Sequence, residues 1–273
     1  MARHLRYAAR STATLDRNTA HTFAAAYALS LYDARAVYSL IPKNGCSTVR
    51  LSLAIANGAI AGPQDINWIH HNNFTFSASR RELVTARYTF AILRCPFARL
   101  ASCYLDKIVG RNFPFWKLDH LLGRTLDPNA YTFRRFVEAL TDEEVRDGDE
   151  HWRPQHDFLV YEDYDDLFDL ADFGTIRRTL AERIGLTLVD ARSHTRHGID
   201  GLKRVAGCGP DTAPLDILVM RSRGEVPEPA SLYDADLIAT VAALYADDLA
   251  LMRARHPQSV MFDEPSAGEG AGG

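Results

Sequence analysis

Residues 36–50 read AVYSLIPKNGCSTVR, and they combine a short apolar strand, a turn and an apolar helix. The strand formers of Ala36–Ile41 are followed by Pro42-Lys43-Asn44-Gly45, which interrupt the strand. From Ser47 to about Ala56 the chain is apolar on nearly all sides, which is typical of a buried helix. The pattern therefore predicts a strand–turn–helix unit.

A second unit of the same kind is predicted over residues 87–110. Arg87–Leu93 (RYTFAIL) is rich in strand formers, and Pro96 suits the first turn of a helix. An apolar stripe at offsets 0, 3, 4, 7 and 11 then follows, formed by Phe97, Leu100, Ala101, Tyr104 and Ile108.

Weaker patterns complete the predicted fold. Further helices are expected at Thr22–Leu31, Thr132–Leu140, Gly174–Ile184 and Leu237–Met252, and further strands at Ile66–Ile69 and Phe158–Tyr161. The acidic run Glu162–Asp172 is expected to be a solvated connection. Strands alternating with helices indicate the α/β class, with a central, mainly parallel sheet flanked by helices. Ligands of such sheets bind at the carboxyl ends of the strands.

Length and composition favour one soluble globular domain. The 273 residues are 47% hydrophobic and 24% charged. We expect a flexible leader over residues 1–20, a single domain over 21–257 and a disordered tail over 258–273.

The charge and the cysteines exclude some classes of protein. A net charge of -4 argues against a protein that coats nucleic acid. The four cysteines form no CxxC pair, so neither a disulfide scaffold nor a structural zinc site is expected.

The turn between the first strand and its helix is a candidate anion site. Free amides and the positive end of the helix dipole at Cys46-Ser47-Thr48 favour an anion. Gly45 lets the backbone approach a phosphate, and Lys43 adds a mobile positive charge. The alternative is a plain turn with Ser47 as helix cap and Lys43 in solvent. A Walker A loop fits poorly, because in that loop the lysine follows the last glycine.

Arg94 and Ser102 form a second candidate anion site. Arg94 follows the second strand, where ligands of this architecture bind, and Ser102 lies within the next helix. A guanidinium fork and a hydroxyl can hold one phosphate together. The alternative is that Arg99 and Asp106, which share the face of Ser102, form a solvated surface. Two such sites suggest a ligand with two separated anionic groups.

The segments PKNGCST (42–48) and RCPFARLASCY (94–104) resemble the two nucleotide-binding motifs of sulfotransferases that use 3'-phosphoadenosine 5'-phosphosulfate (PAPS). The likeness is greatest to carbohydrate sulfotransferases of the chondroitin type, in sulfotransferase family 2. His151-Trp152-Arg153-Pro154-Gln155 is similar to the HWxPQ segment of that family, and Tyr245–Leu249 to its late Y-x-x-D-[FY] helix. The resemblance thus runs in order from about residue 36 to 255.

The sequence departs from the family pattern at several positions. Cys95 replaces the usual acidic residue, and Thr48-Val49 replaces the aromatic residue of the first motif, which leaves the adenine-stacking partner unassigned. The cysteines that follow HWxPQ in the Golgi enzymes are missing, and we expect no membrane anchor. We therefore expect a soluble, bacterial, cytoplasmic member of the family with at most peripheral membrane contact.

The resemblance implies a P-loop-like three-layer fold and sulfuryl transfer from PAPS to a hydroxyl of a glycan, glycolipid or glycosylated metabolite, without a metal ion. Lys43 would stabilise the leaving phosphate, and the turn with Asn44 would hold the 5'-phosphosulfate. Arg94 and Ser102 would hold the 3'-phosphate, with Arg221 and Arg223 from a late basic loop. His70 or His71, in His71-Asn72-Asn73-Phe74, is the expected general base, followed by His151 and Glu162.

Two other functions remain open at this point. One is a P-loop-type small-molecule kinase, which the missing GK[ST] sequence disfavours. The other is a non-catalytic nucleotide-binding protein on the same fold, which the presence of Lys43 disfavours.

Overall fold

The computed structural model describes residues 2–9, 11–12, 14–72, 74–192, 194 and 201–263. By its internal contacts the chain divides into two compact units, residues 1–93 with 153–200 and residues 94–152 with 201–273. Each unit is therefore built from two separate stretches of chain. The single domain expected over 21–257 stays a prediction, and most of the expected tail lies outside the described residues.

The first unit holds a four-stranded sheet in the order β1-β2-β3-β4. Its strands are β1 (Ala28–Leu31), β2 (Ala36–Ser39), β3 (Tyr88–Leu93) and β4 (Asp166–Asp169). Its helices are α1 (Thr19–Ala26), α2 (Cys46–Ala56), α3 (Trp68–His71), α4 (Arg80–Thr85) and α9 (Phe173–Ile184). Strands β2, β3 and β4 run parallel, and β1 pairs antiparallel with β2. The predicted mainly parallel sheet is confirmed.

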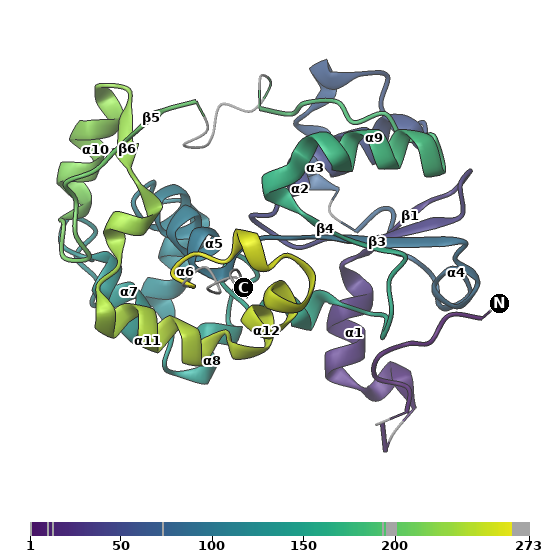
Figure 1. Ribbon diagram of the computed structural model, residues 1–273, viewed down its shortest axis with the longest axis horizontal. Helices are drawn as coiled ribbons and strands as arrows, with labels where there is room; N and C mark the ends of the chain where they lie inside the picture. The colour runs from purple at the N-terminus through teal and green to yellow at the C-terminus, as the bar shows by residue number, and fades with distance from the viewer. Residues whose placement is uncertain are drawn as a thin grey trace, which may run out of the picture. The chain divides into compact units, whose positions relative to one another are not determined.

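Helices cover both faces of this sheet. In Figure 1, α2, α3 and α9 lie on one face and α1 on the other. One apolar cluster joins the strands to Val49 and Leu53 of α2 and to Leu180 of α9. A second, smaller cluster joins Ala24 of α1 and Leu83 of α4. The central sheet is therefore buried on both sides, which explains why β2 and β3 are apolar at almost every position.

Three expected elements in this unit are wrong. The helix predicted over Thr22–Leu31 ends at Ala26, and Ala28–Leu31 instead forms β1, because its backbone pairs with β2 across the turn Tyr32–Arg35. The strand predicted at Ile66–Ile69 is wrong, because Ile66 caps the end of a 3-10 turn and Trp68 and Ile69 are the first residues of α3. Phe158–Tyr161 makes only an isolated bridge, between Tyr161 and Leu5.

The strand next to β3 lies in the acidic run that was expected to be solvated. β4 pairs parallel with β3, with Phe90 opposite Asp166 and Leu93 opposite Asp169. The acidic side chains of this segment accept hydrogen bonds from residues of β3. Asp165 accepts hydrogen bonds from the amide and hydroxyl of Thr89, and Asp166 accepts one from the Tyr88 hydroxyl. These bonds allow an acidic segment to form the edge strand.

Part of the expected flexible leader is packed within the first unit. The Leu5 side chain is buried, and the Arg3 amide donates to the Val84 carbonyl at 2.9 Å. The Arg6 side chain donates to the His156 carbonyl at 2.9 Å. This stretch therefore supports the segment around His156.

The second unit is mainly helical. It contains α5 (Pro96–Cys103), α6 (Phe113–Leu121), α7 (Phe133–Ala139), α8 (Glu143–Asp147), α10 (Pro214–Ser222), α11 (Ala235–Leu244), α12 (Ala246–Arg255) and the parallel strand pair β5 (Lys203–Val205) and β6 (Glu225–Pro227). Its core is aromatic, with Tyr104 against Phe133 at 5.2 Å and Phe136 against Trp152 at 5.6 Å between ring centres.

Three predictions for this unit need correction. The helix expected over Leu237–Met252 is two helices that meet at Tyr245, whose fully buried hydroxyl donates to the Trp152 carbonyl at 2.6 Å. After α5 the chain continues as one π-helical turn, Tyr104–Ile108. The alternative of a solvated face is also wrong, because Arg99 and Asp106 are both buried.

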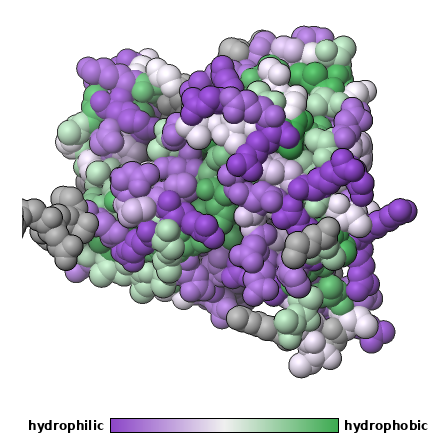
Figure 2. Space-filling view, turned by 45° about the vertical axis from the view of Figure 1, so that its right-hand side comes forward, coloured by the Kyte–Doolittle hydropathy of each residue, from purple (hydrophilic) through white to green (hydrophobic). Residues whose placement is uncertain are grey.

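The surface mixes polar and apolar side chains. On the face drawn in Figure 2, hydrophilic side chains surround several apolar areas. Within the described residues, no helix combines the length and the apolar character needed to cross a membrane.

Candidate functional site

The loop after β2 places two left-handed residues next to the start of a helix. Gly45 is the N-cap of α2 with φ of 73°, and Lys43 also has a positive φ of 70°. A Cβ added at Gly45 would lie 2.9 Å from Cδ1 of Leu170, so glycine is favoured by space as well as by backbone conformation. The amides that begin α2 then carry the positive end of an 11-residue helix.

The side chains at this helix start are placed differently from one another. Lys43, Cys46 and Ser47 are half-buried, whereas Thr48 is buried and its hydroxyl accepts a hydrogen bond from the Ala191 amide at 3.2 Å. Thr48 therefore also ties the start of α2 to the segment after α9. The alternative of a plain turn named Ser47 as the helix cap, but the N-cap of α2 is Gly45, and Ser47 lies within the helix.

The second unit contains the other predicted anion group. Arg94 directly follows β3 and is half-buried, and Ser102 is buried within α5. Arg221 donates to the Leu105 carbonyl at 3.2 Å, three residues beyond Ser102. The expected basic loop is in fact the end of α10, with Arg221 in its last turn and Arg223 as C-cap. Arg223 is exposed.

The predicted histidine pair lies in a short helix. His70 and His71 are the last residues of α3, and both are exposed. Asn73, which belongs to the same sequence pattern, lies outside the described residues.

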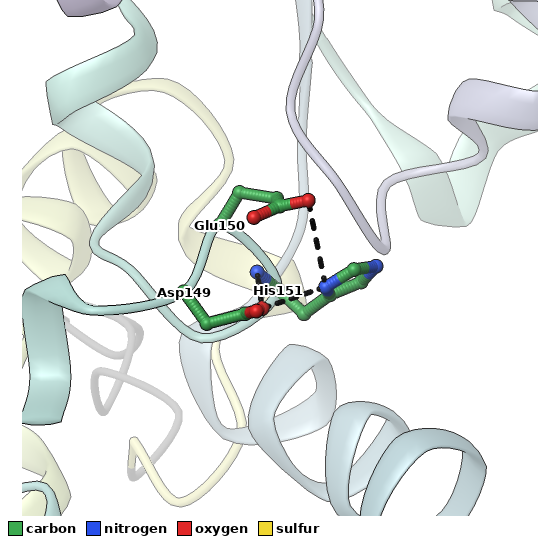
Figure 3. A group of neighbouring side chains, drawn as sticks. All are labelled: Asp149, Glu150 and His151. Carbon is green, nitrogen blue, oxygen red and sulfur yellow. Dashed lines mark hydrogen bonds and ion pairs between the residues drawn. The ribbon is translucent and has the colours of Figure 1, made fainter. Parts of the chain in front are cut away.

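His151 has a different environment from this pair. Its Nδ1 lies 2.7 Å from Oδ1 of Asp149, whose carboxylate is buried, and 4.0 Å from Oε1 of Glu150 (Figure 3). The Asp149 carboxylate also lies 3.4 Å from Nζ of Lys117. A carboxylate that orients an imidazole through Nδ1 is a common support for a general base, because it leaves Nε2 for the substrate. Among the described residues, these three are also the only cluster with the ligand spacing of a metal site. An acidic cluster of this kind by itself does not establish one.

The contact between Asp149 and His151 should make the free energy of unfolding depend on pH. Burial alone would raise the pKa of Asp149, but hydrogen bonds from His151 and the charges of His151 and Lys117 hold that pKa below its usual range. A carboxylate whose pKa is lower in the folded chain than in the unfolded chain stabilises the fold at any pH above its unfolded pKa. This stabilisation is lost as the pH falls through the pKa of the folded chain. Asp149→Asn should therefore cost about 1–3 kcal/mol at pH 7. In urea unfolding, this difference from the wild-type chain should shrink between about pH 5 and pH 2. A difference that stays constant with pH would contradict the assignment.

Comparison with known proteins identifies the relatives of this chain. The profile of the Sulfotransferase family matches residues 32–182, more than half of the chain, and this match includes both predicted anion-binding segments. The chain belongs to the sulfotransferase family. Carbohydrate sulfotransferase 14 of Danio rerio is 25% identical over 140 residues, which cover 44% of this chain and 37% of that protein. The match thus spans well under half of the length of that relative. No solved structure gives a significant match.

Among the contacts within this sulfotransferase, the bond between Asn44 and Gln155 was not foreseen, nor was the carboxylate partner of His151. The sequence contained a signal for both, because Gln155 and His151 belong to the segment HWRPQ that resembles the family pattern. Their partners, Asn44 and Asp149, become apparent only from the folded chain.

Proposed function

We propose that this chain transfers a sulfuryl group from PAPS to a hydroxyl group of a glycan, a glycolipid or a glycosylated metabolite. The observation that carries the proposal is the loop Lys43–Gly45 at the start of α2, which lies within the family match and combines a left-handed glycine, a lysine and the N-terminal end of a helix. The sheet with helices on both faces supports a P-loop-like fold for the donor.

In this proposal the loop binds the 5'-phosphosulfate. The amides of Gly45–Thr48 stabilise its oxygens, and Lys43 stabilises the bridging oxygen as the bond between that oxygen and sulfur breaks. The negative charge that develops on the leaving phosphate is largest in the transition state, so a fixed positive group there lowers the barrier. The reaction requires no metal ion in its simplest form.

The 3'-phosphate is assigned to Arg94 and Ser102, with Arg221 as a further cation. Arg94 and Ser102 belong to the segment that resembles the second nucleotide motif. The contact of Arg221 with the Leu105 carbonyl supports a role for Arg221 beside the turn that follows Ser102. A guanidinium fork is suited to a phosphate dianion because it donates two parallel hydrogen bonds. Arg223 is proposed to contribute charge at the edge of this group.

A histidine in α3 is proposed as the general base that accepts the proton of the acceptor hydroxyl. The segment His71-Asn72-Asn73-Phe74 resembles the H-x-x-F-like segment of related heparan-type sulfotransferases, and His70 is adjacent to it, whereas the contact with Asp149 favours His151 as the second candidate. Replacing the base with asparagine should lower kcat by about 10²- to 10⁴-fold and remove the acidic limb of the pH profile. We expect this result for His70→Asn or His71→Asn and an unchanged profile for His151→Asn. The reverse result would assign the base to His151.

The acceptor and the donor can be tested together. Purified protein is incubated with PAPS carrying radioactive sulfur and with panels of glycans, glycolipids and glycosylated small molecules. Label should appear in a hydroxyl-bearing acceptor and should be absent when the acceptor is omitted. Phosphorylation of the same panel from ATP, without transfer from PAPS, would contradict the proposal and favour a kinase. A cytoplasmic location and the absence of nucleic-acid partners remain predictions.

A further inference from the structure

A buried side-chain amide links the loop after β2 to the segment that begins at Arg153. Asn44 has no exposed surface, and Gln155 is 1% exposed. Nδ2 of Asn44 donates to the Ile92 carbonyl at 2.8 Å and to Oε1 of Gln155 at 2.6 Å. The loop is thereby connected to β3 and to Gln155 at the same time.

The chemistry of the partners fixes the direction of both bonds. The Ile92 carbonyl can only accept, so the amide nitrogen of Asn44 must face it. The same nitrogen then has its second hydrogen left for Gln155, which must present its oxygen. Both hydrogens of the Asn44 amide group are therefore used, and a buried donor that lost its partner would pay a desolvation penalty.

Asn44 lies at the strained part of the loop. Lys43 before it and Gly45 after it both have left-handed backbone conformations, with φ of 70° and 73°. For a residue with a Cβ this conformation costs about 1–2 kcal/mol, so the surroundings must hold it in place. The nearest backbone bond, from the Asn44 amide to the Ile41 carbonyl, is long at 3.3 Å. The side-chain bonds of Asn44 are therefore well placed to maintain the loop.

Gln155 is itself held firmly. It begins a short 3-10 turn, Gln155–Phe158, in which the Phe158 ring packs 5.0 Å from the Phe23 ring of α1. Arg153 donates to the Asp157 carboxylate at 2.8 Å, next to the same turn. The acceptor oxygen thus belongs to a rigid segment, whereas its partner belongs to a strained loop.

We propose that Gln155 is a positioning residue, which acts through Asn44 to hold Lys43 and Gly45 in the conformation that receives the phosphosulfate. The loop anchoring is a property of the fold, and its catalytic consequence rests on the proposed function. Because both residues of this bond are buried, Gln155 would affect the reaction without touching the donor. The segment HWRPQ then supports the donor site through its last residue.

The test compares four variants of the full chain. Gln155→Met removes the acceptor at similar length, Asn44→Ala removes the donor, and the third variant carries both substitutions. Thr89→Val is the matched control, since Thr89 is buried on β3 and its hydroxyl donates to Asp165 at 3.0 Å, with no bond to the loop. Each variant is measured by hydrogen–deuterium exchange of residues 42–48 and by steady-state kinetics with PAPS.

Loss of one hydrogen bond of this kind should raise loop exchange about 5- to 10-fold in Gln155→Met. The double variant should match Asn44→Ala alone, because the two residues act through one bond. We expect kcat to fall about tenfold while the donor KM changes less than about threefold, since misplacement of the loop acts mainly in the transition state. The control should change neither loop exchange nor kcat.

The exchange and kinetic measurements test separate steps of the proposal. Unchanged loop exchange in Gln155→Met, or additive effects in the double variant, would overturn the anchoring. Raised exchange with an unchanged kcat would overturn the positioning role and leave a purely structural bond. If the wild-type chain transfers no sulfuryl group from PAPS, the proposed function fails, and the exchange data still decide the anchoring.

Discussion

Replacing Lys43 with alanine should lower the turnover of sulfuryl transfer by about 10²- to 10³-fold, the range found for the loss of one preorganised charge or donor contact. The physical reason is that, in the proposed reaction, the ammonium group stabilises a charge that grows only as the sulfur–oxygen bond breaks. The loss should therefore appear in kcat rather than in the donor KM. Turnover is measured with labelled PAPS under donor saturation.

The backbone at this position makes the variant easy to interpret. Lys43 has a left-handed φ of 70°, and alanine at the same position carries the same Cβ, so the two residues share the conformational cost. Lys203→Ala is the matched control, because the Lys203 side chain is exposed and its ammonium group forms an ion pair with Glu225 at 3.4 Å. Near-normal turnover in Lys43→Ala, with the melting temperature of the wild-type chain, would remove the catalytic role.

The central strands of the sheet could be predicted, and the outer ones could not. β2 and β3 are buried on both faces, so their sequences are continuous apolar runs that indicate buried strands directly. β1 contains alanine and leucine, which also suit a helix, and it becomes a strand only because β2 offers a partner. β4 carries an aspartate at each end. Asp166 accepts a hydrogen bond from Tyr88 of β3, and Asp169 accepts one from the Ala171 amide in the turn after the strand. The periodicity of the sequence reveals neither contact.

Part of the candidate site could likewise be predicted from the sequence, and part could not. The loop Lys43–Gly45 could be predicted because glycine, lysine and a helix start are close together in the chain, and the structure places them as expected at the start of α2. The contacts of Asn44 with Gln155 join residues 111 positions apart, so they depend on the packing of the whole unit. Arg99 and Asp106 illustrate the opposite error, since charged residues on a helix look solvated until the helix is packed.

Adenosine 3',5'-bisphosphate should stabilise the chain far more than AMP or ATP. At about 100 times its Kd a ligand adds about 2.7 kcal/mol to stability, which corresponds to roughly 5–10 °C in melting temperature for a protein of this size. AMP lacks the 3'-phosphate, and the additional phosphates of ATP lie on the 5' side. Neither nucleotide offers a 3'-phosphate to the site proposed at Arg94 and Ser102, and we expect shifts below about 2 °C at equal concentration.

Arg94→Ala should abolish most of this preference, because it removes the guanidinium fork that distinguishes a 3'-phosphate from a free hydroxyl. The affinity for the bisphosphate should fall at least about tenfold, while the small shift with AMP stays the same. Arg204→Ala, a substitution of an exposed arginine in β5, serves as the control and should leave both shifts unchanged. Equal stabilisation of the wild-type chain by ATP and by the bisphosphate would contradict a site with two separated phosphates and would favour a kinase. Retention of the preference in Arg94→Ala would place the 3'-phosphate on other residues, with Arg221 as the next to be replaced.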